Sequence, residues 1–420
     1  MNFIEELERR GMLHDMTPGI KELLDKEKIT GYIGFDPTAP SLTIGNLVQI
    51  QILTLFQKHG HTPIVLMGGA TGRIGDPSFK DKERELKSPE ELDRNLNFQI
   101  EQIKKLLVFE GLPNNAILFN NYDIYSQMNV LDFLRDVGKT LTVSYMMSKD
   151  SVKNRLETGL SFTEFTYQIL QGYDFQYLFE KYNCILQMGG SDQWGNITSG
   201  TEFIRRNLDQ KAYAVTTPLL TKSDGSKFGK SESGNVWLDP KLTSPYKFYQ
   251  FWLNVADADI PKMFRYFSLL EIHDIEGLLD SLGDQPNQLK KKLAMELTER
   301  IHGKSPMLSA QKVSELLFNP KSDSDFLQSL DEKELQTIAE ELPTFTIRSS
   351  EGELADILCE QSAIFSSKGD FRRAIQNNAI SLNKVKIADH HHKVHARDWL
   401  HGKYLMVENG KKNKYLLEKK

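Results

Sequence analysis

Two lysines stand three positions apart on a loop rich in serine and glycine. Lys227 and Lys230 belong to the run LTKSDGSKFGKS, residues 220–231. Paired cations on such a loop can stabilise the charge that develops when a triphosphate loses pyrophosphate. The same composition also suits an exposed loop with two solvated lysines, so the run alone leaves both interpretations open.

A glycine-rich segment, GGATGRIGDPS at residues 68–78, could bring its backbone close to a ligand. Its Asp76 could accept a hydrogen bond from an ammonium group, and Lys80 and Arg84 downstream could meet phosphates. The spacing matches neither a P-loop nor GxGxxG, which argues against a generic dinucleotide-binding dehydrogenase. A flexible turn with solvated charges is the alternative.

Two further segments combine small residues with the expected start of a helix. GFDPTAPSLTIGN spans residues 34–46, and free N–H groups at a helix N-terminus favour phosphate. Its Gly45 leaves room for a flat base against the backbone. QMGGSDQWGN, residues 187–196, places Asp192 beside two glycines, where a carboxylate suits a ribose diol. Each segment could also be an ordinary capped helix start.

Short apolar runs precede these segments, and runs with helical spacing follow them. Strands that alternate with helices predict a parallel sheet with right-handed crossovers. Ligands of such sheets bind outside the carboxyl ends of the strands, where most of the polar segments fall. The predicted strands are residues 31–36, 63–67, 116–119 and 184–188, and the predicted helices are residues 43–59, 88–110 and 194–207.

The pattern changes along the chain and predicts several domains. Residues 1–222 should form a doubly wound, Rossmann-like α/β domain. Residues 223–320 should hold the lysine loop and an α-helical domain, and residues 321–351 a linker with some helix. Residues 352–420 are predicted to form a small α+β RNA-binding domain. Its helices are expected at 354–361 and after residue 366, and its strands near 381–382, 385–387 and 403–407.

The composition excludes several classes of protein. The 420 residues include 39% hydrophobic residues, 26% charged residues and only two cysteines, which argues against a disulfide scaffold or a thiolate-rich zinc site. No segment approaches the roughly 18 consecutive apolar residues of a membrane span. The N-terminus lacks the basic and apolar regions of a secretory signal. We therefore expect a cytoplasmic protein that does not enter a membrane.

Charge is distributed unevenly along the chain. The net charge is −5, whereas residues 352–420 contain 13 basic and 8 acidic residues. A basic C-terminal segment favours a polyanionic partner such as RNA, although scattered surface lysines would give the same balance. Three adjacent histidines, residues 390–392, are predicted to form a solvated turn, because such neighbours rarely converge on one metal ion.

Taken in order, these segments resemble class I aminoacyl-tRNA synthetases, and in particular the bacterial-type tyrosyl-tRNA synthetases. GFDPTAPSLTIGN stands where this class carries its HIGH signature, and KFGKS, residues 227–231, stands where it carries KMSKS. GATGRIGDPS, SFTEFTYQILQGYDF (residues 161–175) and QMGGSDQWGN are also similar to that family. The similarity covers essentially the whole chain, and the C-terminal segment resembles the alpha-L RNA-binding fold.

The resemblance implies a tyrosine–tRNA ligase. L-Tyrosine would attack the α-phosphorus of ATP to give tyrosyl-adenylate and pyrophosphate, and the tyrosyl group would then pass to the terminal ribose of tRNA(Tyr). Adenylation of this kind depends on positioning and charge stabilisation more than on acid–base chemistry. Mg²⁺ would accompany ATP, held mostly by phosphate oxygens and water, with no metal site of the protein's own.

The resemblance also assigns roles to individual residues. The tyrosine site would comprise Tyr32 and Asp174 at the phenol hydroxyl, and Asp76, Tyr167 and Gln171, with Gln187 nearby, at the ammonium group. Tyr167, Gln171 and Asp174 are four and three positions apart, so one helical face can present all three. The ATP site would comprise Asp36, Thr38, Gly45, Asn46, Gly190, Asp192, Gln193 and Lys230. The departing pyrophosphate would meet Thr38, Lys80, Arg84, Lys227 and Lys230.

A homodimer is implied, with one tRNA spanning both subunits. The candidate subunit interface is the segment 128–165, with the apolar residues Phe133, Met146, Met147 and Phe162. The alternative is that these residues belong to the core, as apolar stripes usually do.

The chain departs from the HIGH signature in having Thr43 and Asn46 where the two histidines stand. Asn46 can still donate to a phosphate, whereas Thr43 loses an imidazole donor, and we expect Thr38 and the loop lysines to compensate. Two alternatives stay open. A tryptophanyl-type synthetase would not need the Tyr32 and Asp174 pair and normally lacks the basic C-terminal segment. A non-catalytic RNA-binding regulator descended from a synthetase would not need the intact KFGKS and GGSDQWGN segments.

Overall fold

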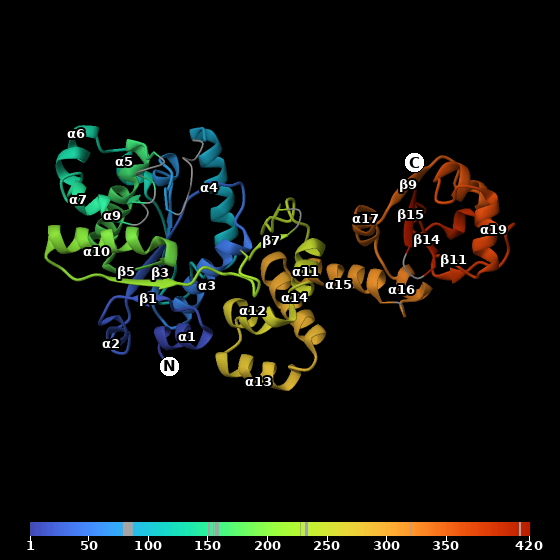
Figure 1. Cartoon of the computed structure of the whole chain (residues 1–420), viewed down its shortest axis with the longest axis horizontal. Coiled ribbons are helices and arrows are strands. Elements are labelled where there is room, and N and C mark those ends of the chain that lie inside the picture. Colours follow the sequence, from blue (N-terminus) through green and yellow to red (C-terminus); the bar gives the residue numbers. More distant parts are fainter. Residues whose placement is uncertain are drawn as a thin grey trace. The chain divides into compact units, whose positions relative to one another are not determined.

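The computed structural model describes residues 1–78, 87–149, 152–153, 155, 159–226, 228–231, 234–319, 321–410 and 413–420. The chain forms two compact units (Figure 1). The first comprises Met1–Ser244 and Phe251–Ile301, and the second comprises Pro245–Gln250 and His302–Lys420. These units divide the chain differently from the predicted domain boundaries, because the helices after residue 244 are shared between them. Within the described part of the chain, no helix is long and apolar enough to cross a bilayer.

A six-stranded sheet lies at the centre of the first unit, in the order β1-β6-β5-β2-β3-β4. Neighbouring strands are parallel except for β1, an edge strand antiparallel to β6. From β2 the chain proceeds outward through β3 to β4, and from β5 it proceeds to β6 on the other side, so the sheet is doubly wound as predicted. The strands are β1 (Asp15–Met16), β2 (Thr30–Phe35), β3 (Thr62–Met67), β4 (Ile117–Asn120), β5 (Cys184–Gly190) and β6 (Tyr213–Thr217).

Helices pack against this sheet and bury it, as a parallel sheet requires. In β3, for example, every residue except Thr62 is buried. Helices α9 and α10 lie side by side (Figure 1) and approach so closely that a Cβ added at Gly172 would lie 2.5 Å from the ring of Phe203. The helices are α1 (Phe3–Arg10), α2 (Ile20–Leu24), α3 (Ile44–Lys58), α4 (Pro89–Ile103), α9 (Phe162–Tyr182) and α10 (Trp194–Leu208). Helix α4 ends before the predicted residue 110.

An insertion between β4 and α9 carries exposed apolar side chains. Its short elements are α5 (Tyr122–Tyr125), α6 (Val130–Asp132), a π-helical turn (Phe133–Val137) and α7 (Val143–Met147). Of the four residues predicted for the subunit interface, Met146 is buried in a core cluster and Phe133 packs against that cluster. Met147 is exposed, and Phe162 is 74% exposed.

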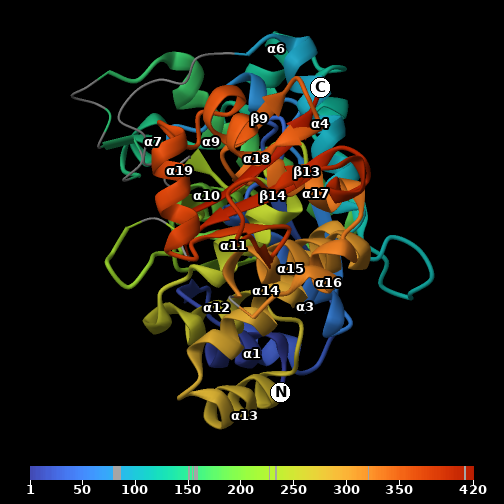
Figure 2. The same ribbon diagram turned by 90° about the vertical axis from the view of Figure 1, so that its right-hand side faces the viewer.

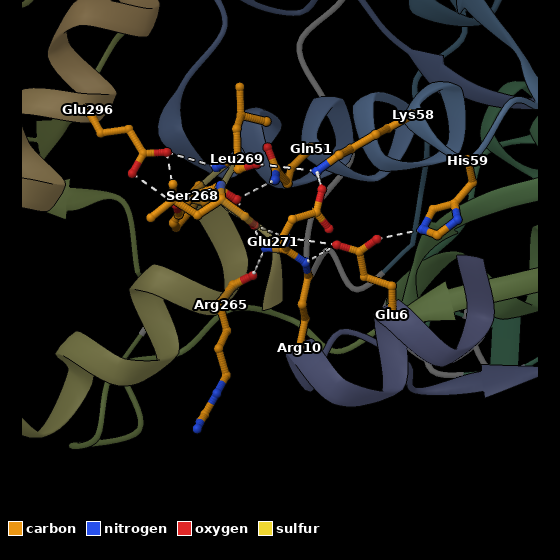
Figure 3. Close-up of polar contacts among 12 residues, drawn as sticks. Glu6, Arg10, Gln51, Lys58, His59, Arg265, Ser268, Leu269, Glu271 and Glu296 are labelled. Atoms are coloured by element: carbon orange, nitrogen blue, oxygen red, sulfur yellow. Dashed lines mark hydrogen bonds and ion pairs between the residues drawn. The ribbon is translucent and has the colours of Figure 1, made fainter. Parts of the chain in front are cut away.

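The first unit continues after β6 with the small ribbon β7 (Lys230–Ser231) and β8 (Gly234–Asn235) and then with helices. Helices α12 (Ile260–Phe267), α13 (Ile272–Leu282) and most of α14 (Pro286–His302) belong to it. The buried Arg10 of α1 holds the loop after α12. Its guanidinium donates to Glu6 Oε1 at 2.8 Å and to the carbonyl oxygens of Arg265, Ser268 and Leu270 at 2.9, 3.0 and 2.8 Å (Figure 3).

Residues of α3 and α14 hold the same loop from other directions (Figure 3). Glu296 accepts from the Ser268 hydroxyl and from the Leu269 N–H, at 2.9 and 2.8 Å. Gln51 donates to the Ser268 carbonyl at 3.1 Å and accepts from Arg300 at 2.6 Å. We call Glu6, Arg10, Gln51, His59, Ser268, Glu296 and Arg300 the joint network.

Glu6 shows how the joint network treats a buried charge. The carboxylate is 1% exposed, and its Oε2 lies 2.5 Å from Nε2 of His59. Burial alone would raise the pKa of Glu6, but hydrogen bonds from His59 and Arg10 and their charges outweigh it and lower that pKa to about 2. The carboxylate is therefore held ionised by its two partners.

The second unit contains a five-stranded sheet in the order β12-β11-β14-β15-β9, with helices α18 and α19 packed beside it (Figure 2). Strand β9 pairs in parallel with β15, although its residues were predicted to lie in a linker. The strands are β9 (Thr344–Ile347), β11 (Ile380–Leu382), β12 (Val385–Lys386), β14 (Tyr404–Asn409) and β15 (Asn413–Lys419), and a separate ribbon pairs β10 (Gly352–Glu353) with β13 (Lys393–Val394). The remaining helices are α11 (Pro245–Leu253), which both units share, α15 (Lys304–Phe318), α16 (Ser324–Gln328), α17 (Glu332–Glu341), α18 (Leu354–Asp356) and α19 (Lys368–Gln376).

Candidate active site

A pocket of about 600 Å³ opens at the carboxyl ends of β2 and β5, where the winding of the sheet reverses. This is the position at which doubly wound sheets bind ligands. Most of the residues predicted for the site line it together: Tyr32, Asp36, Thr38, Gly45, Asn46, Asp76, Tyr167, Gln171, Asp174, Gln187, Gly190, Asp192 and Gln193.

Tyr32 of β2 lines this pocket with its side-chain hydroxyl. The residue is 1% exposed, and its ring packs edge-on against Phe175 with 5.3 Å between ring centroids. Its hydroxyl makes no hydrogen bond within the described part of the chain. Because a buried unpaired hydroxyl costs about 1–3 kcal/mol, this atom is ready to pair with a polar group that enters the pocket.

Asp174 of α9 lines the same pocket and is 1% exposed. Its Oδ2 accepts from Asn121 Nδ2 at 2.9 Å, and its Oδ1 accepts from the Tyr125 hydroxyl at 2.8 Å. Burial raises the pKa of Asp174 to about 7, although the two hydrogen bonds oppose that rise. The carboxyl group can therefore change its charge near neutral pH.

A chain of hydrogen bonds connects Asp174 to Asp36 at the end of β2. Asn121 also donates to the Thr71 hydroxyl at 3.2 Å, and Thr71 donates to Asp36 Oδ1 at 2.7 Å. The Tyr167 hydroxyl donates to Asp36 Oδ2 at 2.8 Å. A Cβ added at Gly68 would lie 1.9 Å from Asp36 Oδ1, so only glycine permits this approach. The first glycine of the predicted segment 68–78 thus serves a close contact.

Asp76 is held by residues at the start of α10. Gln193 donates to Asp76 Oδ2 at 2.7 Å, and the Ser78 N–H donates to Oδ1 at 3.0 Å. Asn196 Nδ2 donates to both Asp76 Oδ1 and the Ser78 hydroxyl, at 3.4 and 3.2 Å. Nearby in the lining, the buried Gln187 has an Oε1 atom without a hydrogen-bond partner among the described residues. The carboxylate and the amide leave acceptor atoms for a cationic or N–H donor.

The start of α3 is closed by its own side chains. The Thr43 N–H and hydroxyl both donate to Asn46 Oδ1, each at 2.9 Å. Asn46, which lines the pocket, keeps its Nδ2 group as a donor that could meet a ligand there. Thr43 therefore caps the helix and shapes the site through Asn46.

The segment around the lysine loop lies against this helix start. Gly229 approaches Gly45 so closely that a Cβ at Gly229 would lie 3.5 Å from the Gly45 nitrogen. The Ile44 N–H donates to the Val236 carbonyl at 3.1 Å, and Phe228 lines the pocket. Loop and helix thus form one wall of the site.

Four of the predicted cationic side chains are not among those that the structure describes. Lys80, Arg84 and Lys227 lie outside the described residues. Lys230 is described by its backbone, which pairs with Asn235 in the ribbon of β7 and β8. Their contacts with phosphate stay a prediction.

Several polar residues that the sequence analysis missed complete the site. Thr71 and Ser78 line the pocket, and Asn121, Tyr125 and Asn196 support its carboxylates. Asn121 directly follows β4, so the rule that polar residues gather at carboxyl ends of strands would have found it. No sequence signal marks Tyr125, because its partner is 49 positions away.

Comparisons with family models agree with this geometry. Residues 24–319 match the model of tRNA synthetases class I (W and Y). Residues 334–417 match the model of the tyrosine–tRNA ligase SYY-like C-terminal domain.

Relatives and solved structures agree with the family models. A tyrosine–tRNA ligase of Cytophaga hutchinsonii is 52% identical over 424 residues, and one of Bacteroides fragilis is 51% identical over 428 residues. In both alignments 99% of each chain is covered. A C-terminally truncated mitochondrial tyrosyl-tRNA synthetase of Aspergillus nidulans superposes with a TM-score of 0.67 at 30% identity. That match covers 76% of this chain and 94% of the other.

Proposed function

Since the chain belongs to the class I tyrosine–tRNA ligases, we propose that the pocket at β2 and β5 is where it forms tyrosyl-adenylate. As a tyrosine–tRNA ligase, the protein activates L-tyrosine with ATP and transfers it to tRNA(Tyr). The observation that carries the assignment is the unpaired hydroxyl of Tyr32, buried in a pocket that the Asp174 carboxylate also lines.

The phenol hydroxyl of the substrate would bind Tyr32 and Asp174. A substrate hydroxyl can donate to the carboxylate and accept from Tyr32, whereas phenylalanine would leave both groups unpaired. The ammonium group would bind Asp76, Tyr167 and Gln171, with Gln187 Oε1 as a further acceptor. Tyr167 would contribute to this ammonium site from the same face of α9 as Asp174.

ATP would lie across the start of α3 and the end of β5. Gly45, Gly190 and Asp192 would bind adenosine, with Asp36 and Gln193 beside them. Thr38 and the Nδ2 group of Asn46 would contact phosphates at the N-terminus of α3, where the helix dipole favours negative charge. Lys227 and Lys230, joined by Lys80 and Arg84, would neutralise the departing pyrophosphate.

Mg²⁺ would travel with the nucleotide. Both oxygens of Asp36 already accept hydrogen bonds from Thr71 and Tyr167, so phosphate oxygens and water would supply most of its ligands. The ion would neutralise phosphate charge as pyrophosphate leaves.

The acceptor end of tRNA would enter beside the adenylate. A second pocket of about 300 Å³ shares Asp192 with the first and is lined by His14, Lys149 and Trp194. An indole that stacks on a base and a lysine near a phosphate suit a terminal nucleotide. The basic segment 352–420 would bind another part of the tRNA. Trp194→Ala should slow tRNA charging at least tenfold, about 1.4 kcal/mol, and leave adenylation unchanged.

The insertion before α9 would form the contact between two subunits. Leu131 and Phe162 are 73% and 74% exposed, and such exposed apolar groups mark interfaces when they cluster. We expect the double variant Leu131→Asp and Phe162→Asp to sediment as a monomer while the parent sediments as a dimer. Phe318→Asp, on an equally exposed phenylalanine of α15, is the matched control and should leave the mass unchanged.

The site of action would be a reducing cytoplasm, in keeping with two unpaired cysteines, of which Cys184 is buried.

The deciding experiment is exchange between pyrophosphate and ATP without tRNA, with tyrosine, phenylalanine and tryptophan as parallel substrates. Tyrosine should support exchange, phenylalanine should do so only weakly, and tryptophan should not. Exchange with tryptophan would contradict the roles of Tyr32 and Asp174, and no exchange with any of the three would direct attention to Thr43.

A further inference from the structure

Tyr125 lies behind the pocket rather than in its lining. It ends α5, and its ring packs against Phe133 and Tyr173 with centroids 6.1 and 6.3 Å apart. Its hydroxyl nevertheless touches the lining, because it lies 2.8 Å from Oδ1 of Asp174. A residue in this position can act on a substrate only through that carboxyl group.

The Tyr125 hydroxyl has two acceptors within reach. It lies 2.8 Å from Asp174 Oδ1 and 2.8 Å from the carbonyl oxygen of Leu170, one helical turn earlier in α9. A hydroxyl has one hydrogen to donate and lone pairs with which to accept. When Asp174 is ionised, the hydrogen favours the carboxylate, because a charge-assisted hydrogen bond is the stronger one. When Asp174 is protonated, the hydroxyl can donate to Leu170 and accept a hydrogen bond from the protonated Oδ1.

Asn121, the other partner of Asp174, has no such freedom. Its Oδ1 accepts from the Ala70 N–H at 2.7 Å, so its Nδ2 must remain the group that faces Asp174 Oδ2. An amide nitrogen can only donate, so this contact keeps Oδ2 an acceptor in both charge states. A proton that binds to Asp174 therefore binds at Oδ1, the oxygen that contacts the Tyr125 hydroxyl.

We propose that Tyr125 is a positioning residue for amino-acid selection: its hydroxyl, shared between Asp174 and Leu170, orients the carboxyl group that reads the substrate hydroxyl and helps to keep it ionised. The proposal rests on the role proposed above for Asp174. The packing of the ring against Phe133 and Tyr173 fixes the hydroxyl in place, so removing its oxygen alone removes the effect.

The charges around Asp174 give the proposal a pH signature. Among the described residues, the titratable groups that interact with Asp174 are the hydroxyls of Tyr32, Tyr125 and Tyr167 and the Asp36 carboxylate. Burial raises the pKa of all three tyrosines well above the usual value, so they stay protonated near neutral pH. Asp36 raises the pKa of Asp174, whereas the hydrogen bond from Tyr125 lowers it. Loss of that bond should therefore move the titration of Asp174 to higher pH.

The test uses the full-length Tyr125→Phe variant in the exchange assay, with Tyr173→Phe as the matched control. Tyr173 contacts the same ring but makes no described contact with Asp174. We expect Tyr125→Phe to raise KM for tyrosine about tenfold at neutral pH, as loss of one charge-assisted hydrogen bond predicts, with kcat within about twofold. The pH at which KM for tyrosine begins to rise on acidification should increase by about half a unit to one unit. Tyr173→Phe should match the parent in both respects.

Phenylalanine supplies an internal check on folding. Phenylalanine has no hydroxyl for the carboxyl group to bind, so the loss should be confined to tyrosine and kcat/KM for phenylalanine should not fall in Tyr125→Phe. A misfolded preparation would lose activity toward both amino acids, and tyrosine binding by the folded fraction, measured by equilibrium titration, would then replace KM as the readout. Unchanged tyrosine affinity together with an unchanged pH profile would overturn the proposal.

Asp174→Asn separates this proposal from the function on which it rests. If Asp174→Asn abolishes the preference for tyrosine while Tyr125→Phe keeps the parent's preference in full, only the inference about Tyr125 is wrong. If both variants retain the preference, the reading role of Asp174 is wrong as well.

Discussion

The pocket at β2 and β5 and the joint network both bury polar groups, but they provide them with different numbers of hydrogen-bond partners. In the joint network, one oxygen of Glu6 contacts Arg10 and the other contacts His59. Arg10 also donates hydrogen bonds to three carbonyl oxygens. In the pocket, the Tyr32 hydroxyl and the Gln187 Oε1 have no described partner. Polar groups that are all paired with one another hold elements together, whereas buried polar groups without a partner can bind a ligand.

The pKa values of the two carboxylates follow the same division. Glu6 and Asp174 are each 1% exposed. Burial is the largest effect on both, but interactions with His59 and Arg10 bring the pKa of Glu6 down to about 2, whereas neutral donors leave that of Asp174 raised to about 7. A set of partners that includes a guanidinium thus keeps Glu6 ionised, while Asp174, whose described donors are an amide and a hydroxyl, can exchange a proton at neutral pH.

Disrupting the joint network should produce the largest effect, a loss of folding stability. Arg10→Met leaves Glu6 with one partner and removes the described donor of the Arg265 and Leu270 carbonyl oxygens, while Ser268 keeps only Gln51, and it should lower the free energy of unfolding by about 3–5 kcal/mol. Urea unfolding followed by circular dichroism measures this. Arg9→Met is the matched control, because Arg9 is 48% exposed in a surface pair and should cost at most about 1 kcal/mol. Equal losses in the two variants would contradict the comparison.

Removing an unpaired atom from the pocket should act in the opposite sense. Tyr32→Phe deletes a buried hydroxyl that has no described partner, so the unfolding free energy should stay the same or rise. Discrimination of tyrosine from phenylalanine, measured as a ratio of kcat/KM in the exchange assay, should fall about 10- to 100-fold. A drop in stability comparable with that of Arg10→Met would show that the hydroxyl is structural.

The two carboxylates should give stability opposite dependences on pH. Stability from Glu6 is complete above its usual pKa of 4.5 and is lost as pH falls toward 2. For Asp174, whose folded pKa is raised from 3.8 to about 7, the cost of ionisation is absent below 3.8 and grows as pH rises through 7. Asp174→Asn should therefore gain stability over the parent between pH 5 and pH 8, by about 1–2 kcal/mol, because the asparagine has no charge to bury. Thermal unfolding across this range measures the gain, with Glu6→Gln as the control that loses stability instead.

The smallest effect is expected where the helix cap meets the nucleotide site. Thr43 already holds Asn46 by two hydrogen bonds, so Thr43→His should change the adenylation rate by less than tenfold, about 1.4 kcal/mol. Pre-steady-state measurement of tyrosyl-adenylate formation checks this. A larger gain in rate would mean that Thr38 and the lysines do not compensate for the missing imidazole.

Residues near one another in sequence were the easiest to predict. The short apolar runs predicted β2, β3 and β5, and the polar segments after them predicted most of the pocket lining. Strand β9 was missed because it forms by pairing with β15, some 70 positions away, and not from its own pattern. The joint network was missed for the same reason, since Arg10 contacts carbonyl groups more than 250 positions distant. Tertiary partners of this kind leave no local periodicity to detect.

Helix α3 joins the two regions compared here. Its first turn carries Gly45 and Asn46 in the pocket wall, and farther along it Gln51 belongs to the joint network. With 15 residues it is a rod about 22 Å long. A tilt of α12 and α14 would therefore be transmitted along α3 to the proposed nucleotide site. If such a tilt accompanies binding at those helices, thermodynamic reciprocity requires that the nucleotide alter that binding by the same factor.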